Sequence, residues 1–122
     1  MKRLLLRRKR ILRDLPSLEE AIRGSVVERR LRCGKPACWC AQGDGHPATY
    51  LCVTLAPGRA EQISLPAKLA PLARLWVANY TAWREALEQI SQINREWLRR
   101  LRKQDRARVA ATNLRARRRR RP

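Results

Sequence analysis

Three cysteines and the chain's single histidine lie close enough in the sequence to bind one metal ion. The motif runs Cys33-Gly34-Lys35-Pro36-Ala37-Cys38-Trp39-Cys40, and His46 follows six residues later. Three thiolates and one imidazole form a Cys₃His tetrahedral set, which is typical of closed structural zinc sites without an open coordination position. We therefore expect a Zn²⁺ site formed by Cys33, Cys38, Cys40 and His46.

The fourth cysteine leaves the identity of one ligand open. Cys52 lies in an apolar, β-branched run, where a cysteine is usually a small buried residue, but it could replace His46. We favour His46, because it follows a glycine-containing loop that can fold back on the thiolates. An iron–sulfur cluster commonly uses four cysteines at other spacings. Unconnected reduced thiols are the simplest alternative, and three cysteines within eight residues disfavour it.

The residues around the motif predict a small sheet. Residues 25–32 and 50–55 have strand character, a Pro57-Gly58 turn follows, and residues 61–65 form the return strand. Upstream, Ser17 and Glu20 have the spacing of a capping box, which predicts a short helix that ends at Gly24. The expected fold class is α+β: a small zinc-stapled three-stranded antiparallel sheet followed by a long heptad-patterned helix, with basic arms at both ends. The metal would supplement a core that is marginal on its own.

Residues 69–101 carry the clearest periodic pattern. Apolar side chains occupy the a and d positions of nearly five heptads, with Asn94 as the one polar exception. This stripe could cover the chain's own sheet, or it could pair with a partner helix. We expect the first half to pack on the sheet and the second half on a second copy of the chain, as a homodimer, or on another helical protein. The residues expected to mediate self-association are Trp76, Tyr80, Trp83, Leu87, Ile90, Asn94 and Trp97.

Basic residues are concentrated at the two ends of the chain. The 122 residues carry a formal net charge of +19, with 29 basic and 10 acidic side chains. Residues 1–13 hold seven basic side chains and no acid, and residues 99–121 hold twelve, opposed only by Asp105. Residues 14–98 are nearly balanced, with ten basic and nine acidic side chains. A codon bias toward arginine would spread it evenly, so this segregation indicates a polyanionic partner.

We expect four segments: a basic N-terminal arm or helix at 1–16, the metal knuckle and sheet at 17–66, the long helix at 67–102, and a disordered arginine-rich tail at 103–122. Arginines that displace counterions from phosphates add affinity without reading base sequence. The candidate nucleic-acid-binding residues are Arg3, Arg7, Arg8, Lys9, Arg10, Arg13, Arg99, Arg100, Arg102, Arg106, Arg108, Arg115, Arg117, Arg118, Arg119, Arg120 and Arg121.

The central residues resemble a known family. The run from Gly24 to Arg30, the motif from Cys33 to Cys40, and Gly45-His46-Pro47 before an aromatic strand resemble small prokaryotic proteins that carry a domain of unknown function. That family has a CGKPxCxC…HG signature followed by a strand hairpin and a long helix, and the resemblance covers about residues 17–101. It implies that the cysteines and the histidine are metal ligands. Its members are often encoded near mobile elements, which implies a nucleic-acid role.

The sequence predicts a non-enzymatic protein. The metal set would use the only histidine, and the chain has no glycine-rich phosphate loop. We expect a zinc-stabilised nucleic-acid-binding protein, an accessory component of a mobile-element or other nucleoprotein complex, with DNA narrowly favoured over RNA. The alternatives are a zinc-stapled adaptor that assembles a larger complex through its long helix, or an RNA-binding component of a ribonucleoprotein.

The expected location is cytoplasmic, either nucleoid-associated or within a nucleoprotein complex. No stretch approaches the roughly 20 apolar residues that span a bilayer, and Arg7 interrupts the apolar run at residues 4–6 that resembles a signal peptide. A basic helix at residues 1–15 could bind a membrane surface, but it would leave the C-terminal arginines unexplained. We therefore expect no membrane partner.

Overall fold

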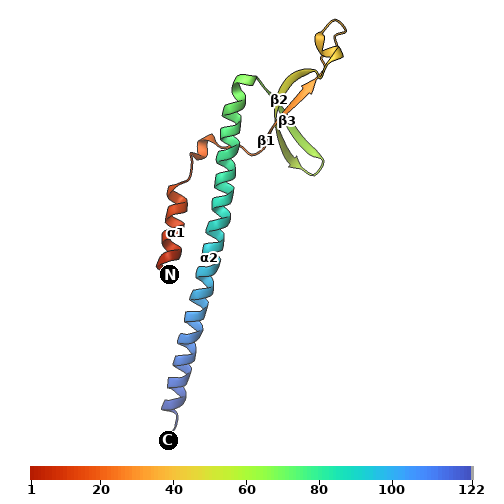
Figure 1. Cartoon of the computed structure of the whole chain (residues 1–122). Helices are drawn as coiled ribbons and strands as arrows, with labels where there is room; N and C mark the ends of the chain where they lie inside the picture. Colours follow the sequence, from red (N-terminus) through yellow and green to blue (C-terminus); the bar gives the residue numbers. More distant parts are fainter. Residues whose placement is uncertain (122) are drawn as a thin grey trace. The chain divides into compact units, whose positions relative to one another are not determined.

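The computed structural model describes residues 1–121 (Figure 1). It confirms the α+β class, since a three-stranded antiparallel sheet is followed by a long helix. The elements, in chain order, are helix α1 (Lys2–Arg13), the 3₁₀ turn η1 (Leu18–Glu20), strand β1 (Ser25–Leu31), the 3₁₀ turn η2 (Trp39–Gln42), strands β2 (His46–Ala56) and β3 (Arg59–Leu65), the 3₁₀ turn η3 (Ala67–Leu69) and helix α2 (Ala70–Arg119). In this part of the chain, no helix is long and apolar enough to cross a membrane.

The sheet has the order β1-β2-β3, with β2 in the centre. The β1–β2 register runs from Ser25 opposite Cys52 to Leu31 opposite His46. The β2–β3 hairpin closes through Pro57 and Gly58, and Gly58 has a φ of +74°, a left-handed conformation that glycine adopts without a steric penalty. The predicted strands and turn are therefore present, but β2 begins four residues earlier than expected and includes His46.

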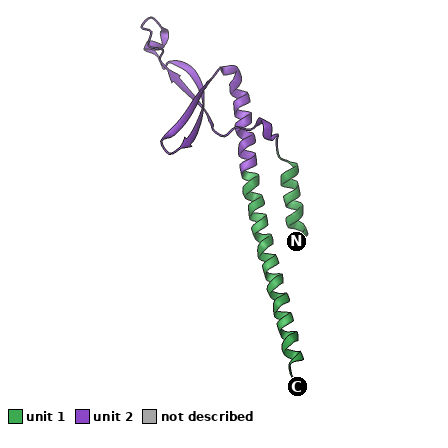
Figure 2. Cartoon of the chain, turned by 180° about the vertical axis from the view of Figure 1, so that it is seen from behind, with its two compact units in different colours: residues 1–15, 85–122 green, residues 16–84 purple. Residues whose placement is uncertain are grey.

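The chain divides into two compact units (Figure 2). Unit 1 consists of residues 1–15 and 85–122, and unit 2 consists of residues 16–84. Unit 2 therefore contains the sheet, the cysteine motif and the first turns of α2, while unit 1 contains α1 and the remainder of α2.

The core of unit 2 forms where apolar side chains of the sheet and of α2 are buried. Leu51 and Val53 of β2 and Ala70 and Ala73 of α2 are all buried. An apolar pocket of about 270 Å³ remains, lined by Ile22, Leu51, Ile63, Leu65, Leu69, Leu72, Ala73 and Trp76. This is a small core, and such a core benefits from an additional covalent or metal constraint.

The segment before β1 is fixed to α2 by three hydrogen bonds within unit 2. The Ile22 N–H donates to the Trp76 carbonyl at 3.0 Å. The Asn79 side-chain amide donates to the Glu20 carbonyl at 2.8 Å. The Trp83 indole N–H donates to the Pro16 carbonyl at 2.9 Å. The first half of the heptad stripe therefore contacts the segment before β1, and it also meets the sheet, where Ala73 and Trp76 line the apolar pocket together with Leu51 and Ile63.

In unit 1, α1 lies beside α2 in both views (Figures 1 and 2). The Arg8 guanidinium donates to the Asn94 side-chain oxygen at 3.0 Å, and Ile93 is only 2% exposed. The second half of the stripe was expected to pack on a partner helix, but here it packs on α1 of the same chain. Leu87 and Leu98 stay outside this packing, each 64% exposed.

Two local expectations were wrong. Ser17 makes no side-chain capping bond, and the short helix predicted there is only the single 3₁₀ turn η1. The C-terminal tail is not irregular from residue 103, because α2 continues to Arg119. No glycine or proline occurs from residue 72 to residue 121, and alanine and arginine are strong helix formers, so nothing in the sequence ends the helix earlier.

Candidate functional site

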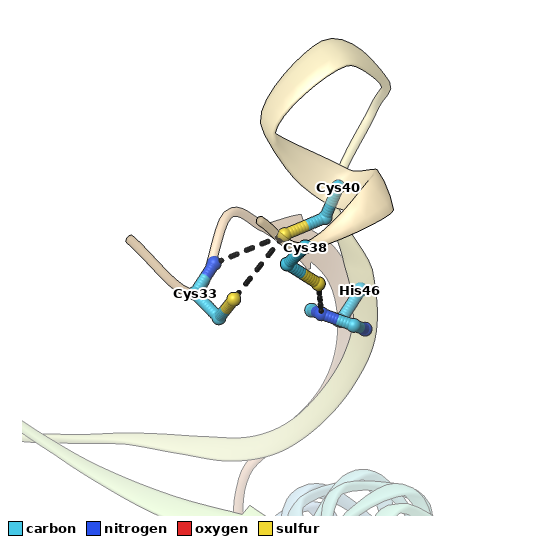
Figure 3. A group of neighbouring side chains, drawn as sticks. All are labelled: Cys33, Cys38, Cys40 and His46. Atoms are coloured by element: carbon cyan, nitrogen blue, oxygen red, sulfur yellow. Dashed lines mark hydrogen bonds between the residues drawn. The ribbon is translucent and has the colours of Figure 1, made fainter. Parts of the chain in front are cut away.

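The four predicted metal ligands come together at one end of the sheet (Figure 3). Cys33 follows β1, Cys38 and Cys40 lie at the start of η2, and His46 is the first residue of β2. Their candidate ligand atoms all lie within 4.8 Å of one another. The pairing of β1 with β2 therefore brings together ligands that the sequence separates by thirteen residues.

The distances between these ligand atoms are close to those expected around a tetrahedrally coordinated ion. The Sγ atoms of Cys33 and Cys40 are 3.4 Å apart, and Cys38 Sγ is 3.1 Å from His46 Nε2. A zinc ion with bonds of about 2.3 Å to sulfur and about 2.05 Å to nitrogen places two sulfurs about 3.8 Å apart, and a sulfur and a nitrogen about 3.6 Å apart. The sulfur–sulfur separation is far beyond a disulfide bond of about 2.05 Å. The cluster of free thiols and one imidazole is thus compatible with a bound metal ion.

Gly45 positions His46 through a close approach of two strands. Gly45 is buried and has a φ of +96°. A Cβ atom at this position would lie 2.6 Å from the Leu31 carbonyl carbon. Only glycine avoids this clash, and the neighbouring pair Leu31–His46 then starts the β1–β2 ladder. The backbone conformation that positions the imidazole therefore requires glycine at position 45.

Two arginines of the first strand region also hold the loop. Arg32 Nε donates to the Gly43 carbonyl at 3.2 Å, and Arg30 Nη1 donates to the Gly45 carbonyl at 3.5 Å. These contacts connect the chain before Cys33 with the loop that leads into His46. Sequence reasoning did not assign a role to either arginine, although Arg32 directly precedes the first cysteine.

The thiols differ in electrostatic environment. The Lys35 backbone N–H, followed by contacts with the Cys40 and His46 side chains, lowers the pKa of the exposed Cys33 to about 6. The Cys33 backbone N–H lowers the pKa of Cys40, but burial and the Cys33 and Cys38 thiols outweigh it, so the pKa of Cys40 is raised. Cys33 therefore supplies a thiolate ligand at neutral pH more readily than Cys40 does.

Cys52 lies apart from this cluster. It is half-buried in the middle of β2, opposite Ser25 on one side and Gln62 on the other. Six residues of extended strand, about 20 Å, separate it from His46. Of the two candidates for the fourth ligand, the structure brings His46 to the site and leaves Cys52 as a residue of the sheet.

The candidate nucleic-acid-binding residues all belong to unit 1. Unit 1 holds 20 basic and 5 acidic side chains, a formal net charge of +15, whereas unit 2 holds 9 and 5, a net charge of +4. The two basic arms lie at opposite ends of the sequence, yet α1 and the C-terminal part of α2 are in one compact unit. This is the largest concentration of one sign of charge in the chain.

Few of these basic side chains have an acidic partner. The ion pairs are Arg13–Asp14 at 3.4 Å, Arg99–Glu96 and Arg100–Glu96 at 3.3 Å each, and Arg108–Asp105 at 3.9 Å. Arg8 contacts Asn94. Among residues 1–121, the other twelve candidates form no ion pair and are exposed: Arg3, Arg7, Lys9, Arg10, Arg102, Arg106, Arg115, Arg117, Arg118, Arg119, Arg120 and Arg121.

The residues expected to mediate self-association fall into two groups. Five of the seven are half-buried by contacts within the chain: Trp76, Tyr80, Trp83, Ile90 and Trp97. The other two, Leu87 and Asn94, are exposed, and Asn94 accepts the hydrogen bond from Arg8. The apolar side chains left for a partner are therefore mainly leucines.

Comparison with known proteins identifies a family and nothing further. No curated protein and no solved structure matches the chain. A family model described as a domain of unknown function matches residues 1–73, which is more than half of the chain. The match includes α1, which lies outside the range 17–101 expected from the sequence, and it ends at the fourth residue of α2. The chain therefore belongs to the family of the domain of unknown function DUF6788.

Proposed function

We propose that this chain is a non-enzymatic nucleic-acid-binding protein that is stabilised by one zinc ion. It would act as an accessory component of a mobile-element or other nucleoprotein complex, with DNA narrowly favoured over RNA. The observation that carries the proposal is the charge of unit 1, which contains 20 basic and 5 acidic side chains. The twelve exposed, unpaired basic side chains supply phosphate contacts without a competing carboxylate.

The C-terminal end of α2 supports a polyanionic partner. Residues 115–121 contain six arginines, and helical neighbours three and four apart repel one another. The C-terminus of a helix favours positive charge, but only within the last turn. Phosphates along a nucleic acid would neutralise this segment and stabilise its helix. DNA is favoured because two basic helical segments in one unit suit the regular phosphate spacing of a duplex.

Zinc is the proposed metal because of the ligand set. Cys₃His sites with all four positions filled by protein are typical of structural zinc, and the small core of unit 2 is of the kind that zinc stabilises. In this proposal the only histidine is used by the metal, which leaves no imidazole for acid–base catalysis. The metal holds the fold, and the arginines bind the ligand.

Deletion of residues 103–122 tests the proposal. It removes nine basic side chains and none of the four metal ligands, so zinc content and melting temperature should persist. Affinity for a 20-base-pair duplex should fall, and the slope of log K against log salt should become shallower by about 0.9 for each phosphate that the chain no longer neutralises. A variant with Arg59→Gln and Lys68→Gln removes two exposed charges from unit 2 and serves as the control. Equal salt slopes for full-length and truncated chains would refute the role of the tail.

An adaptor function is the second candidate, and one observation favours it. Leu87, Leu98 and Leu101 are 64%, 64% and 40% exposed, and their spacing places them along one stripe of α2. A second copy of the chain, or another helix, could cover this stripe. Sedimentation without nucleic acid, at increasing protein concentration, separates a self-associating protein from a monomer. A duplex RNA of the same length, measured beside the DNA, tests the ribonucleoprotein alternative.

A further inference from the structure

Trp39 differs from the other three tryptophans in its exposure. It lies in η2 between Cys38 and Cys40 and is 63% exposed, whereas Trp76, Trp83 and Trp97 of α2 are half-buried. The flanking cysteines belong to the metal cluster, so the backbone on both sides of Trp39 is held in place. A large aromatic side chain is therefore presented to solvent from a constrained loop.

The indole is supported on two sides and open elsewhere. Its ring centroid lies 4.9 Å from that of His46, with an angle of 70° between the planes, which is an edge-on contact. A Cβ atom at Gly43 would lie 4.0 Å from both Cε3 and Cζ3 of the indole, so the ring rests close to that glycine. These contacts orient the ring without covering it, which leaves π-surface free for a planar ligand.

A guanidinium is fixed to the same glycine. Arg32 Nε donates to the Gly43 carbonyl at 3.2 Å, and the side chain remains exposed. Gly43 thus lies next to the indole and also accepts the hydrogen bond from the guanidinium. Residues 29–46 carry four basic side chains and one acidic one, Asp44, so the surroundings of the pair are positive. An aromatic face beside a cation matches the two parts of a nucleotide, its base and its phosphate.

We infer that Trp39 and Arg32 form a nucleotide-binding site on the metal knuckle, where an unpaired base stacks on the indole and its phosphate binds the guanidinium. The inference rests on the proposed function, and it adds a preference for single-stranded nucleic acid at this site. A base inside a duplex cannot stack on a side chain, because its faces are covered by its neighbours. The knuckle would therefore contact an unpaired stretch, while the arginines of unit 1 bind phosphates of either form.

The test compares single-stranded and duplex DNA on the full chain. The probes are a fluorescein-labelled dT12 strand and a 12-base-pair duplex, each titrated with the wild type, Trp39→Ala, Trp39→Leu and Trp39→Phe. Trp39→Ala should weaken dT12 binding roughly 5- to 150-fold, the range for removal of one base–aromatic stack. Duplex affinity should change less than about twofold. Trp39→Phe should keep most of the affinity, because it retains an aromatic face, whereas Trp39→Leu should behave like Trp39→Ala.

Two further measurements test the base stacking on Trp39 and the phosphate contact of Arg32 separately. The tryptophan fluorescence of the wild type should be quenched by dT12, and Trp39→Phe should lose this quenching while it still binds. Arg32→Gln should weaken dT12 binding and make its salt slope shallower by about 0.7, the value for one phosphate contact on a single strand. Metal content and melting temperature, measured for every variant, show whether the knuckle is intact.

The outcomes separate this inference from the proposed function. Unchanged dT12 affinity in Trp39→Ala would overturn the stacking site, even if the C-terminal deletion weakens binding as expected. An equal loss of affinity for dT12 and duplex would overturn it as well, because the indole would then act through the fold. If the wild type binds neither probe at low salt, the proposed function fails, and the stacking site fails with it.

Discussion

Gly45→Ala should damage the metal site without touching a ligand. The added Cβ would lie 2.6, 2.7 and 2.9 Å from the carbonyl carbon, oxygen and nitrogen of Leu31, and backbone atoms cannot rotate away as a side chain can. The φ of +96° adds strain for any residue with a Cβ. Each effect costs roughly 1–3 kcal/mol, so the free energy of unfolding should fall by roughly 2–6 kcal/mol.

Gly58→Ala is the matched control for this change. Gly58 also has a positive φ, +74°, but a Cβ there would meet no atom within 4 Å. It should cost only the backbone strain, roughly 1–2 kcal/mol. At about 4–8 °C per kcal/mol for a domain of 60–100 residues, the two variants should differ clearly in melting temperature.

The measurements are thermal unfolding by circular dichroism and zinc content by elemental analysis. Gly45→Ala should lose zinc at chelator concentrations that leave Gly58→Ala loaded, because the clash displaces the backbone that presents His46. If the two variants melt together and hold zinc equally, the close approach of Gly45 to Leu31 does not position the site, and the reasoning is wrong.

Three further predictions concern the thiols and the exposed face of α2. Cys38→Ser should lose the one zinc per chain and lower the melting temperature of the sheet, whereas Cys52→Ser should keep both the zinc and the melting temperature, as read by elemental analysis and circular dichroism. In chelator-treated protein, the rate of Cys33 alkylation should rise with pH through a midpoint near pH 6, because its lowered pKa keeps the thiolate form down to that pH. Cys40, whose pKa is raised, should stay unreactive at neutral pH. A Cys33 midpoint near pH 9 would contradict this prediction. If α2 self-associates, Leu87→Asp should shift sedimentation to the monomer with little change in melting temperature, because this side chain is 64% exposed within the chain.

Local sequence patterns predicted most of the elements. The β-branched run before Pro57-Gly58 and the apolar residues after it gave the hairpin, because strand propensity and turn chemistry act over a few residues. The metal ligands were also predictable, since three cysteines within eight residues have few other uses. The role of Gly45 could not be predicted, because the clash that requires a glycine comes from Leu31, fourteen residues away.

The packing of α1 against α2 could not be predicted from local sequence patterns. Arg8 and Asn94 form a hydrogen bond between α1 and α2, but they are 86 residues apart, and no local pattern indicates that they meet. Asn94 occupies the position of a register-fixing residue in a coiled coil, so the sequence pointed to a partner helix. The structure supplies a polar contact from the same chain. The heptad pattern identified the buried stripe correctly, but periodicity alone cannot say which helix covers it.

The end of α2 was missed for a related reason. Dense like charge indicates a segment that remains disordered without a partner, whereas alanine, arginine and the absence of glycine or proline favour a continuing helix. In the structure the helix continues to Arg119. Its arginines therefore extend along a helix, where their spacing is fixed; in the proposed function, this would favour several simultaneous phosphate contacts over independent ones.

The family match divides the basic residues of unit 1 into two sets. Residues 1–73 include α1 with its seven basic side chains, but they exclude the arginines at the end of α2. The knuckle, Trp39 and Arg32 also lie within the matched region. The metal site and one basic helix therefore belong to the part of the chain that the family shares, and the second basic segment lies outside the match.

Deletion of residues 103–122 leaves eleven of the 20 basic side chains of unit 1. If both sets bind phosphates, the truncated chain should bind more weakly, with a shallower salt slope, but it should still bind. A complete loss of binding would assign the function to the tail alone.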